Sequence, residues 1–202
     1  MKFLAFVDLH GWYNIIDELH KKVDENKIDV LLCSGDITVF GREINLVLKR
    51  LNEIGCKIVM IHGNHEDPTE MGDKCEKYEN LVFIHKSSYS VDNYIFFGFG
   101  GDGFSKRDED FKRVSKMFEK DYNSTKEDDT KLIVLLHGPP FGTKLDLVGE
   151  NHVGNKDYSD FIKSIKPNLV VCGHIHENSE KKDKIGDSIV VNPGNKGMIF
   201  DI

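Results

Sequence analysis

The sequence predicts an α/β protein with parallel strands, and two observations support this fold class. Short apolar segments rich in β-branched residues recur along the chain, and such segments form strands that are buried on both faces. Each segment is followed directly by residues that can bind a metal or transfer a proton. Because open α/β sheets bind ligands at the carboxyl ends of their strands, we expect these residues to share one site. The segments are residues 3–7, 30–33, 58–61, 132–136 and 169–172.

The first third of the chain alternates strand and helix. After residues 3–7, apolar side chains recur at helical spacing from Trp12 to Val23, with charged residues between them. After residues 28–33, the same spacing runs from Ile44 to Ile54, and Gly55 follows as a predicted C-cap. This order predicts three parallel strands joined by right-handed helical crossovers.

The middle of the chain predicts shorter elements. Residues 68–78 indicate a short helix or an irregular segment, and residues 81–84, 89–91 and 94–99 are short strand candidates. Asp92-Asn93 is a good hairpin turn between the last two strands. The glycine-rich residues 98–103 lack the Lys-Ser/Thr of a P-loop and follow a hairpin. We therefore interpret them as a flexible or substrate-adjacent loop rather than a nucleotide site.

The rest of the chain returns to the α/β pattern. Residues 106–131 carry balanced charges, typical of a solvated face, and an apolar stripe that predicts a surface helix with a polar exit loop at 123–129. After strand 132–136, a helix stripe at 161–165 is stopped by Pro167. Residues 184–191 predict a hairpin around Gly186-Asp187, and residues 197–202 a closing strand.

The composition indicates a single domain. The chain has 202 residues, of which 39% are hydrophobic and 30% charged, so we expect one domain spanning residues 1–202. Its net charge of −7 argues against long nucleic acids as partners. The four cysteines lack Cys-x-x-Cys spacing, which excludes a zinc ribbon and indicates reduced thiols. No apolar run approaches the ~20 residues of a membrane span, and Asp8 comes too early for a signal peptide. We therefore expect a cytoplasmic protein with no membrane association.

The strand ends supply carboxylate, imidazole and carboxamide groups but no thiolate. Such a nitrogen and oxygen donor set suits Mn, Fe, Zn, Ni or Co. The set is too large for one tetrahedral zinc but suits two metals that share a bridging carboxylate, an arrangement that clamps a phosphoryl group and activates a water. Asp8 and His10 are two positions apart, as are His174 and His176, so an extended segment would project each pair to one side. The residues are Asp8, His10, Asp36, Asn64, His65, His137, His174 and His176.

The order of these residues resembles that of a known superfamily, the calcineurin-like metallophosphoesterases, from residue 2 to about residue 194. The motifs that carry the resemblance are Asp8-x-His10, Gly35-Asp36, Gly63-Asn64-His65-Glu66, His137 and Gly173-His174-x-His176. The resemblance implies a two-sheet αββα sandwich. Gly173-His-Ile-His-Glu177 followed by Asn192-Pro-Gly194 looks most like a compact phosphodiesterase branch. The Asp-Arg-Gly signature of the serine/threonine phosphatases is missing after Gly35-Asp36.

The resemblance also implies roles for individual residues. His65 would bind the substrate phosphate and protonate the leaving oxygen, which suits imidazole, while a metal-bridging hydroxide attacks phosphorus. We expect two divalent transition-metal ions, with Mn favoured and Ni, Fe, Co or Zn as alternatives. The implied ligands are Asp8, His10 and His176 for the first metal, Asn64, His137 and His174 for the second, and Asp36 as the bridge.

For other polar residues the sequence leaves more than one role open. Arg42 is a candidate phosphate ligand or a solvated residue at a helix start, and His152 is a candidate substrate contact on a loop at 145–154. Glu66 could orient His65 or cap a helix, and the sequence does not distinguish the two. We interpret His62 as a residue behind the ligands or in the core. His20 and His85 receive no role, and Asn192-Pro-Gly194 is interpreted as a structural turn.

The predicted function is hydrolysis of a small phosphodiester by a dimetal phosphoesterase. A phosphomonoesterase or a nucleotide pyrophosphatase on the same metal core is the alternative. A scaffold with decayed metal ligands is disfavoured because the ligand set is complete. A nuclease on long DNA or RNA is disfavoured because the chain is acidic and compact. The sequence makes no prediction of oligomeric state.

Overall fold

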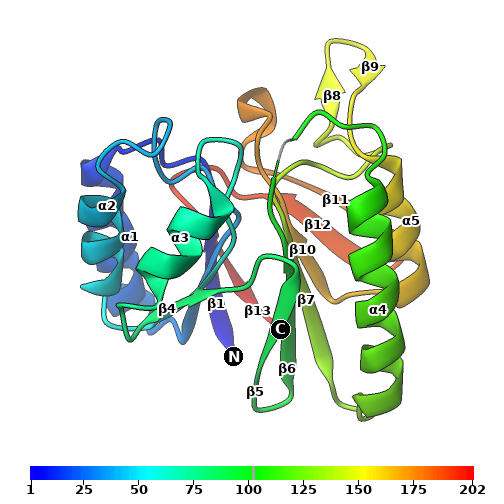
Figure 1. The fold of residues 1–202 in the computed structure, drawn as a ribbon, viewed down its shortest axis with the longest axis horizontal. Coiled ribbons are helices and arrows are strands. Elements are labelled where there is room, and N and C mark those ends of the chain that lie inside the picture. The colour runs from blue at the N-terminus through cyan, green and yellow to red at the C-terminus, as the bar shows by residue number, and fades with distance from the viewer. Residues whose placement is uncertain (102) are drawn as a thin grey trace.

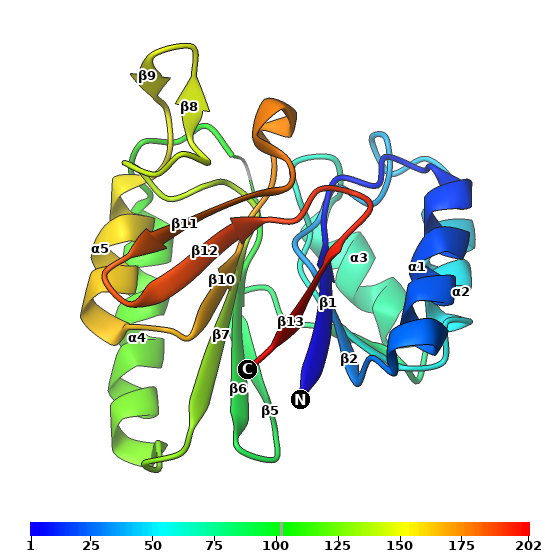
Figure 2. The same ribbon diagram turned by 180° about the vertical axis from the view of Figure 1, so that it is seen from behind.

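Two β-sheets pack face to face, and helices cover the outer face of each sheet (Figures 1 and 2). The computed structural model describes residues 1–101 and 103–202. From one side of the molecule to the other, the layers are helix, sheet, sheet and helix. The αββα sandwich that the resemblance implied is therefore confirmed.

The first sheet contains the predicted strand and helix alternation of the first third of the chain. Its strands are β1 (Lys2–Phe6), β2 (Val30–Cys33), β3 (Lys57–Met60), β4 (Leu81–Phe83) and β13 (Met198–Asp201). In the order β13-β1-β2-β3-β4, the first four strands of the chain run parallel and β13 pairs antiparallel with β1. The helices α1 (Tyr13–Asn26), α2 (Ile44–Asn52) and α3 (Pro68–Cys75) cover its outer face (Figure 1). The segment that begins at Pro68 is thus a helix rather than irregular.

The second sheet is built from the remainder of the chain. Its strands are β5 (Ser87–Val91), β6 (Tyr94–Phe99), β7 (Lys131–Leu136), β10 (Leu169–Val171), β11 (Lys181–Ile185) and β12 (Ser188–Asn192). In the order β11-β12-β10-β7-β6-β5, the inner four strands run parallel and the two edge strands antiparallel. The helices α4 (Glu109–Thr125) and α5 (Lys156–Ile165) cover its outer face (Figure 2). Both predicted hairpins are present, and α4 continues past the predicted start of its exit loop at residue 123.

The segment 145–154 is not only a loop but contains a small hairpin of β8 (Leu147–Val148) and β9 (Asn151–His152). This hairpin projects at the same end of the molecule as the short 3-10 helix η1 (His176–Asn178) (Figure 1). The glycine-rich segment 98–103 includes Asp102, which lies outside the described residues.

Three apolar layers hold the sandwich together. Strand neighbours such as Phe96 and Phe97 point to opposite sides: Phe96 packs between the sheets and Phe97 packs under α4 and α5. Burial on both faces explains why the parallel strands read as continuous apolar runs. The packing fixes the sheets so that β1, β2, β3, β7 and β10 end at one edge of the sandwich (Figures 1 and 2). No helix among residues 1–101 and 103–202 has the length and apolar character needed to cross a membrane.

Candidate metal centre

Ligand-type side chains from separate strand ends converge at this edge. Three groups of three side chains have their ligand atoms within 4.8 Å of one another. Because Asp36 and His10 each belong to two groups, the three groups form one continuous cluster. The groups are Asp8, His10 and His176; His10, Asp36 and His65; and Asp36, His137 and His174.

The backbone turns sharply where it presents these side chains. Asp8, His10, Asp36 and His174 have positive φ angles of 57°, 45°, 51° and 69°. Residues other than glycine adopt this left-handed conformation at a cost of about 1–2 kcal/mol each, and such strain concentrates at functional sites. The expectation that extended segments project Asp8 with His10, and His174 with His176, is therefore wrong. The tight turns are held instead by backbone hydrogen bonds, such as that from Asp8 N–H to the Gly35 carbonyl at 3.1 Å.

Asp36 is held as a carboxylate at the centre of the cluster. Its Oδ2 lies 3.4 Å from His137 Nε2 and 3.9 Å from the Nε2 atoms of His10 and His65. Burial disfavours its charged form, but the hydrogen bond and charge of His137 and the backbone N–H of His65 outweigh burial and lower the pKa of Asp36 to about 2. For Asp8, burial is the dominant cause and raises the pKa to about 6.

Backbone carbonyls orient two of the histidines towards the cluster. His137 Nδ1 lies 2.8 Å from the Ser34 carbonyl, and His10 Nδ1 lies 3.3 Å from the Thr38 carbonyl. A carbonyl only accepts hydrogen bonds, so each Nδ1 carries a proton, and the neutral form of each ring presents its Nε2 lone pair to the cluster. This tautomer suits a histidine that binds a metal through Nε2.

The spacing of the donor atoms fits shared cations. His10 Nε2 lies 3.1 Å from His176 Nε2, and Asn64 Oδ1 lies 3.0 Å from His137 Nε2 and 2.9 Å from His174 Nδ1. Two nitrogens each about 2.0–2.1 Å from one tetrahedral ion would be separated by roughly 3.3 Å. The donors therefore fit first-row divalent metals in type and in spacing.

Glu66 has a role that the sequence did not reveal. Its buried carboxylate accepts hydrogen bonds from the backbone N–H groups of Asp36 (3.0 Å), Thr38 (2.9 Å) and Gly63 (3.0 Å) and from the Thr38 hydroxyl (2.7 Å). Asp67, not Glu66, caps α3. Neither proposed role of Glu66 is supported, because its carboxylate instead joins the loop after β2 to the loop after β3.

Close approach of these two loops requires glycine. Gly35 has a φ of +94°, and a Cβ at this position would overlap the backbone of Gly63. A Cβ at Gly63 would overlap the side chain and backbone nitrogen of Asp36. The glycines that precede Asp36 and Asn64 therefore allow the two side chains to reach one site.

His65 presents a donor rather than a lone pair to the cluster. Its Nδ1 accepts a hydrogen bond from the Phe40 N–H at 3.2 Å, and its ring stacks on the Phe40 ring at a centroid distance of 4.3 Å. The proton of neutral His65 is therefore on Nε2, which faces Asp36. Although His65 lies among the possible metal ligands, this tautomer suits hydrogen-bond donation to a substrate oxygen better than metal binding through Nε2.

The comparison with known proteins agrees with this geometry. The family model for calcineurin-like phosphoesterases matches residues 1–178. This chain belongs to the calcineurin-like phosphoesterase family. It is 33% identical to an uncharacterized protein of Methanocaldococcus jannaschii, over 100% of this chain and 92% of that protein. It is 26% identical to a probable cyclic nucleotide phosphodiesterase of Synechococcus sp., over 74% of this chain and 58% of that protein.

Several solved structures superpose on nearly the whole chain. A Thermus thermophilus protein matches with a TM-score of 0.79 and 18% identity, over 96% of this chain and 89% of the other. A dimetal phosphatase from Danio rerio matches with a TM-score of 0.66 and 9% identity, over 95% and 86% of the two chains. An archaeal phosphodiesterase matches with a TM-score of 0.51 and 16% identity, over 96% and 84%. At these identities the matches show the shared fold.

Arg42 and His152, the two predicted substrate residues, belong to none of the three ligand groups. Arg42 is exposed, and within the described part of the chain its side chain forms no hydrogen bond or ion pair. His152 Nδ1 lies 2.7 Å from the buried Asp146, which also accepts hydrogen bonds from the N–H groups of Gly142, Thr143 and Gly154. His152 thus fastens the β8–β9 hairpin to its base, and a substrate contact for either residue stays a prediction.

The structure also shows hydrogen-bond partners for His85, His62 and Asn192 that were not predicted from the sequence. His85 received no role, yet its Nδ1 lies 3.1 Å from Nε2 of the buried His62 and accepts a hydrogen bond from Gly100 N–H at 3.0 Å. Burial, followed by the charge of His62, lowers the pKa of His85 to about 3. The buried Asn192 donates to the Ile175 carbonyl at 3.2 Å, which supports a structural role for the Asn192-Pro-Gly194 turn.

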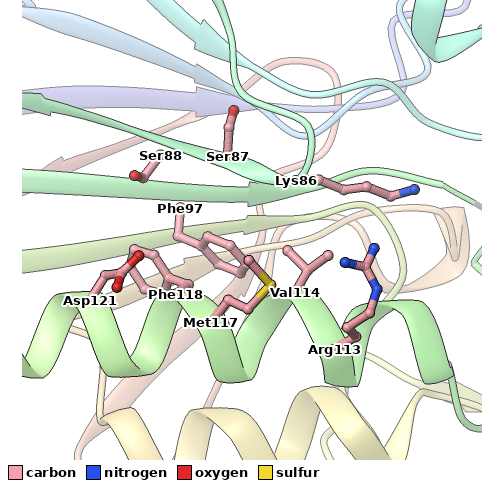
Figure 3. A pocket seen from close by; sticks show the side chains of 9 residues that line it. All are labelled: Lys86, Ser87, Ser88, Phe97, Arg113, Val114, Met117, Phe118 and Asp121. Atoms are coloured by element: carbon pink, nitrogen blue, oxygen red, sulfur yellow. The ribbon is translucent and has the colours of Figure 1, made fainter.

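The molecule also has a groove that is separate from the metal centre. It has a volume of about 300 Å³ and lies between β5 and α4, with Phe97, Val114 and Phe118 among its lining residues (Figure 3). Its two cationic side chains, Lys86 and Arg113, both pair with Asp110 at 2.6 Å. None of the candidate metal ligands lines this groove.

Proposed function

We propose that this chain is a dimetal phosphodiesterase that hydrolyses a small phosphodiester. The observation that carries the proposal is the carboxylate of Asp36, which belongs to two ligand groups at once. One carboxylate between two sets of nitrogen and oxygen donors is the arrangement required for a bridge between two metal ions. Bound there, the ions supply Lewis-acid activation of a phosphoryl group and of a water.

The ligand residues divide into two sets around the bridge. The metals are proposed to be divalent transition ions, Mn first, because the donor set contains imidazole, carboxylate and amide groups without thiolate. The proposed ligands are Asp8, His10 and His176 on one side, Asn64, His137 and His174 on the other, and Asp36 between them.

His65 is proposed to donate a hydrogen bond to the substrate phosphate and, in its imidazolium form, the proton that the leaving oxygen needs. The backbone N–H of Phe40 fixes the proton of neutral His65 on Nε2, and the stacked Phe40 ring holds the imidazole plane. Nε2 faces Asp36 across 3.9 Å, so it lies beside the place where a phosphoryl group would bind. Proton donation from a positioned imidazole contributes about 10²–10⁴-fold to a rate.

The charge around the cluster favours a diester over a monoester or a diphosphate. Two cavities border the cluster, with volumes of about 280 and 310 Å³. Within the described chain, no Lys or Arg lines either cavity, whereas Asp8 and Glu177 do. A diester carries one negative charge and a monoester dianion carries two, so the lack of cationic side chains in the two cavities favours the diester. The names of a relative and a structural neighbour, both phosphodiesterases, support the same choice.

The four free cysteines support a reducing compartment such as the cytoplasm as the place of action. Three of them are buried, and burial raises the pKa of each of these thiols. The acidic net charge supports a small-molecule substrate over long nucleic acid.

The test is hydrolysis of paired nitrophenyl monoesters and diesters by protein stripped of metal and then titrated separately with Mn, Ni, Co, Zn and Mg. We expect diester turnover only after addition of a transition metal, with two ions bound per chain by calorimetry. His20→Ala is a matched control, since His20 is an exposed histidine on α1 away from the cluster. Equal turnover with and without metal, or turnover of the monoester alone, would contradict the proposal.

A further inference from the structure

A cavity beside the first ligand group has features that the metal chemistry does not require. Its volume is about 280 Å³, and one side is formed by the ligand residues Asp8, His10 and His176. The other side is formed by Trp12, Ser179 and Asn195. Small-molecule sites commonly measure about 300–1,000 Å³, so this space suits one part of a substrate rather than a whole one.

The chain topology assembles the cavity from distant segments. β13 pairs antiparallel with β1, and the turn before β13 lies against the end of β1, where Val7 N–H donates to the Gly194 carbonyl at 3.1 Å. This contact brings Asn195 next to the loop that carries Trp12. Ser179 follows η1, and its N–H donates to the carbonyl of the ligand His176 at 3.0 Å.

Trp12 presents a solvent-exposed aromatic side chain from a backbone that is held in place. Its N–H donates to the Leu9 carbonyl and its carbonyl accepts from Ile15 N–H, so the backbone is held in the turn before α1. Even so, 60% of the side chain is exposed. A large aromatic surface held open beside a catalytic cluster is a platform on which another flat ring can stack.

The polar groups of the cavity complement a flat heterocycle. The Asn195 amide offers a donor and an acceptor, and the Ser179 hydroxyl offers both as well. Within residues 1–101 and 103–202, neither side chain makes a hydrogen bond to the protein. An aromatic ring that can stack on a base, together with a nearby amide that can hydrogen-bond to the edge of the base, is a combination that recognises a nucleobase.

Among the described residues, the cavity offers no cationic side chain to an anionic occupant. The described lining contains no Lys or Arg, and Asp8 contributes a carboxyl group. A second phosphate or a carboxylate would therefore find no cationic side chain to pair with, whereas an uncharged base needs none.

We propose that this cavity is a nucleobase subsite, so that the substrate of the metal centre is a nucleoside phosphodiester whose base stacks on Trp12 and hydrogen-bonds to Asn195. The inference rests on the proposed phosphodiesterase activity, under which the scissile phosphate binds near Asp36. It adds a recognition site on the side of Asp8, His10 and His176.

Binding can be measured without catalysis. Trp12 is the single tryptophan of the chain, so intrinsic fluorescence of the Zn²⁺-loaded protein reports on this residue alone. We expect AMP to quench the fluorescence in a saturable way and ribose phosphate, which lacks the base, to leave it unchanged. Asn195→Ala should weaken the affinity for AMP at least about threefold, since one hydrogen bond is lost. Equal responses to AMP and ribose phosphate would overturn the subsite.

Selectivity provides the second measurement. The substrates are the nitrophenyl ester of AMP and the nitrophenyl ester of ribose 5-phosphate, which share a leaving group and differ in the base. Trp12→Ala should lower the ratio of their kcat/KM values at least about fivefold, because stacking on the ring is lost. Trp12→Phe should restore most of the ratio and Trp12→Leu should not. Met117→Ala removes an equally exposed apolar side chain on α4 and should leave the ratio unchanged.

The outcomes separate this inference from the proposed function. Turnover of both diesters with a ratio insensitive to Trp12 would overturn the subsite and leave the phosphodiesterase intact. Quenching by AMP together with no turnover of either diester would support the subsite and overturn the proposed activity.

Discussion

Oε1 of the buried Glu66 accepts two hydrogen bonds from Thr38, one from its N–H at 2.9 Å and one from its hydroxyl at 2.7 Å. The other carboxylate oxygen accepts from Asp36 and Gly63. One side chain thus satisfies four donors in two loops that each present a proposed metal ligand. The position of Asp36 relative to Asn64 depends on this carboxylate.

Glu66→Ala should therefore destabilise the protein strongly. It leaves four donors without their acceptor, and each unpaired buried donor costs about 1–3 kcal/mol, reduced where water enters the space. We expect the free energy of unfolding, measured by urea titration, to fall by about 3–5 kcal/mol. Glu25→Ala is the control, because the exposed Glu25–Lys21 pair contributes less than about 1 kcal/mol. Similar losses in both variants would refute the role given to Glu66.

Asp36→Asn should abolish the shared metal site while the fold persists. The amide is nearly isosteric but carries no charge to bridge two cations. We expect calorimetry to show loss of at least one of the two binding events, and diester turnover to fall by orders of magnitude. Circular dichroism should be unchanged. Retention of two tight metal sites would show that Asp36 is not the bridge.

His65→Ala should affect poor leaving groups more than good ones. A methoxide needs the proton that His65 donates, whereas a nitrophenolate leaves largely without it. We expect about 10²–10⁴-fold slower hydrolysis of a dialkyl phosphate and a smaller loss with a nitrophenyl diester. Metal stoichiometry should stay at the wild-type value. If both substrates slow equally and one metal is lost, His65 is a ligand and not a proton donor.

Gly63→Ala should weaken metal binding by displacing Asp36. The added Cβ would overlap the Asp36 side chain and its backbone nitrogen. The loops must separate to relieve the overlap, so metal affinity should fall at least about tenfold. Gly72→Ala is the matched control: this glycine is inside α3, its Cβ would meet Phe83 at 3.4 Å, and the change should stabilise the helix by about 0.5–1 kcal/mol. Unaltered metal affinity in Gly63→Ala would contradict the close approach.

His85 should make the protein sensitive to mild acid. Its pKa is about 3 in the folded protein against 6.5 for the free side chain, so the unfolded chain binds the extra proton as the pH falls below 6.5. The stability that neutral His85 contributes is therefore present above pH 6.5 and is lost as the pH falls towards 3. The loss is at most about 1.4 kcal/mol per pH unit, and partial exposure of the ring makes it smaller. His85→Gln should flatten the pH dependence of the urea midpoint between pH 6.5 and 4.5. A parallel profile for variant and wild type would contradict this assignment.

Much of the fold and the ligand set could be predicted because the signals are local. Burial on both faces makes the segments that became β1, β2, β3, β7 and β10 continuously apolar, and the residue types that follow them need only be read in order. The helical spacing before Gly55 and the turn at Asp92-Asn93 depend on neighbours a few residues away. Local patterns of this kind are sufficient to indicate the α/β class and the candidates Asp36 and His137.

The tertiary structure decided what depends on groups distant in the chain. Only the approach of two loops shows that Glu66 serves Thr38 and Asp36, since 28 to 30 positions separate the partners. Positive φ angles at Asp8 and His174 replace the extended geometry that spacing suggested. Trp12 and Asn195 line one cavity because β13 returns beside β1. Residue types and local periodicity are written in the sequence, whereas the direction of a side chain and its hydrogen-bond partners are set by long-range packing, which no local pattern encodes.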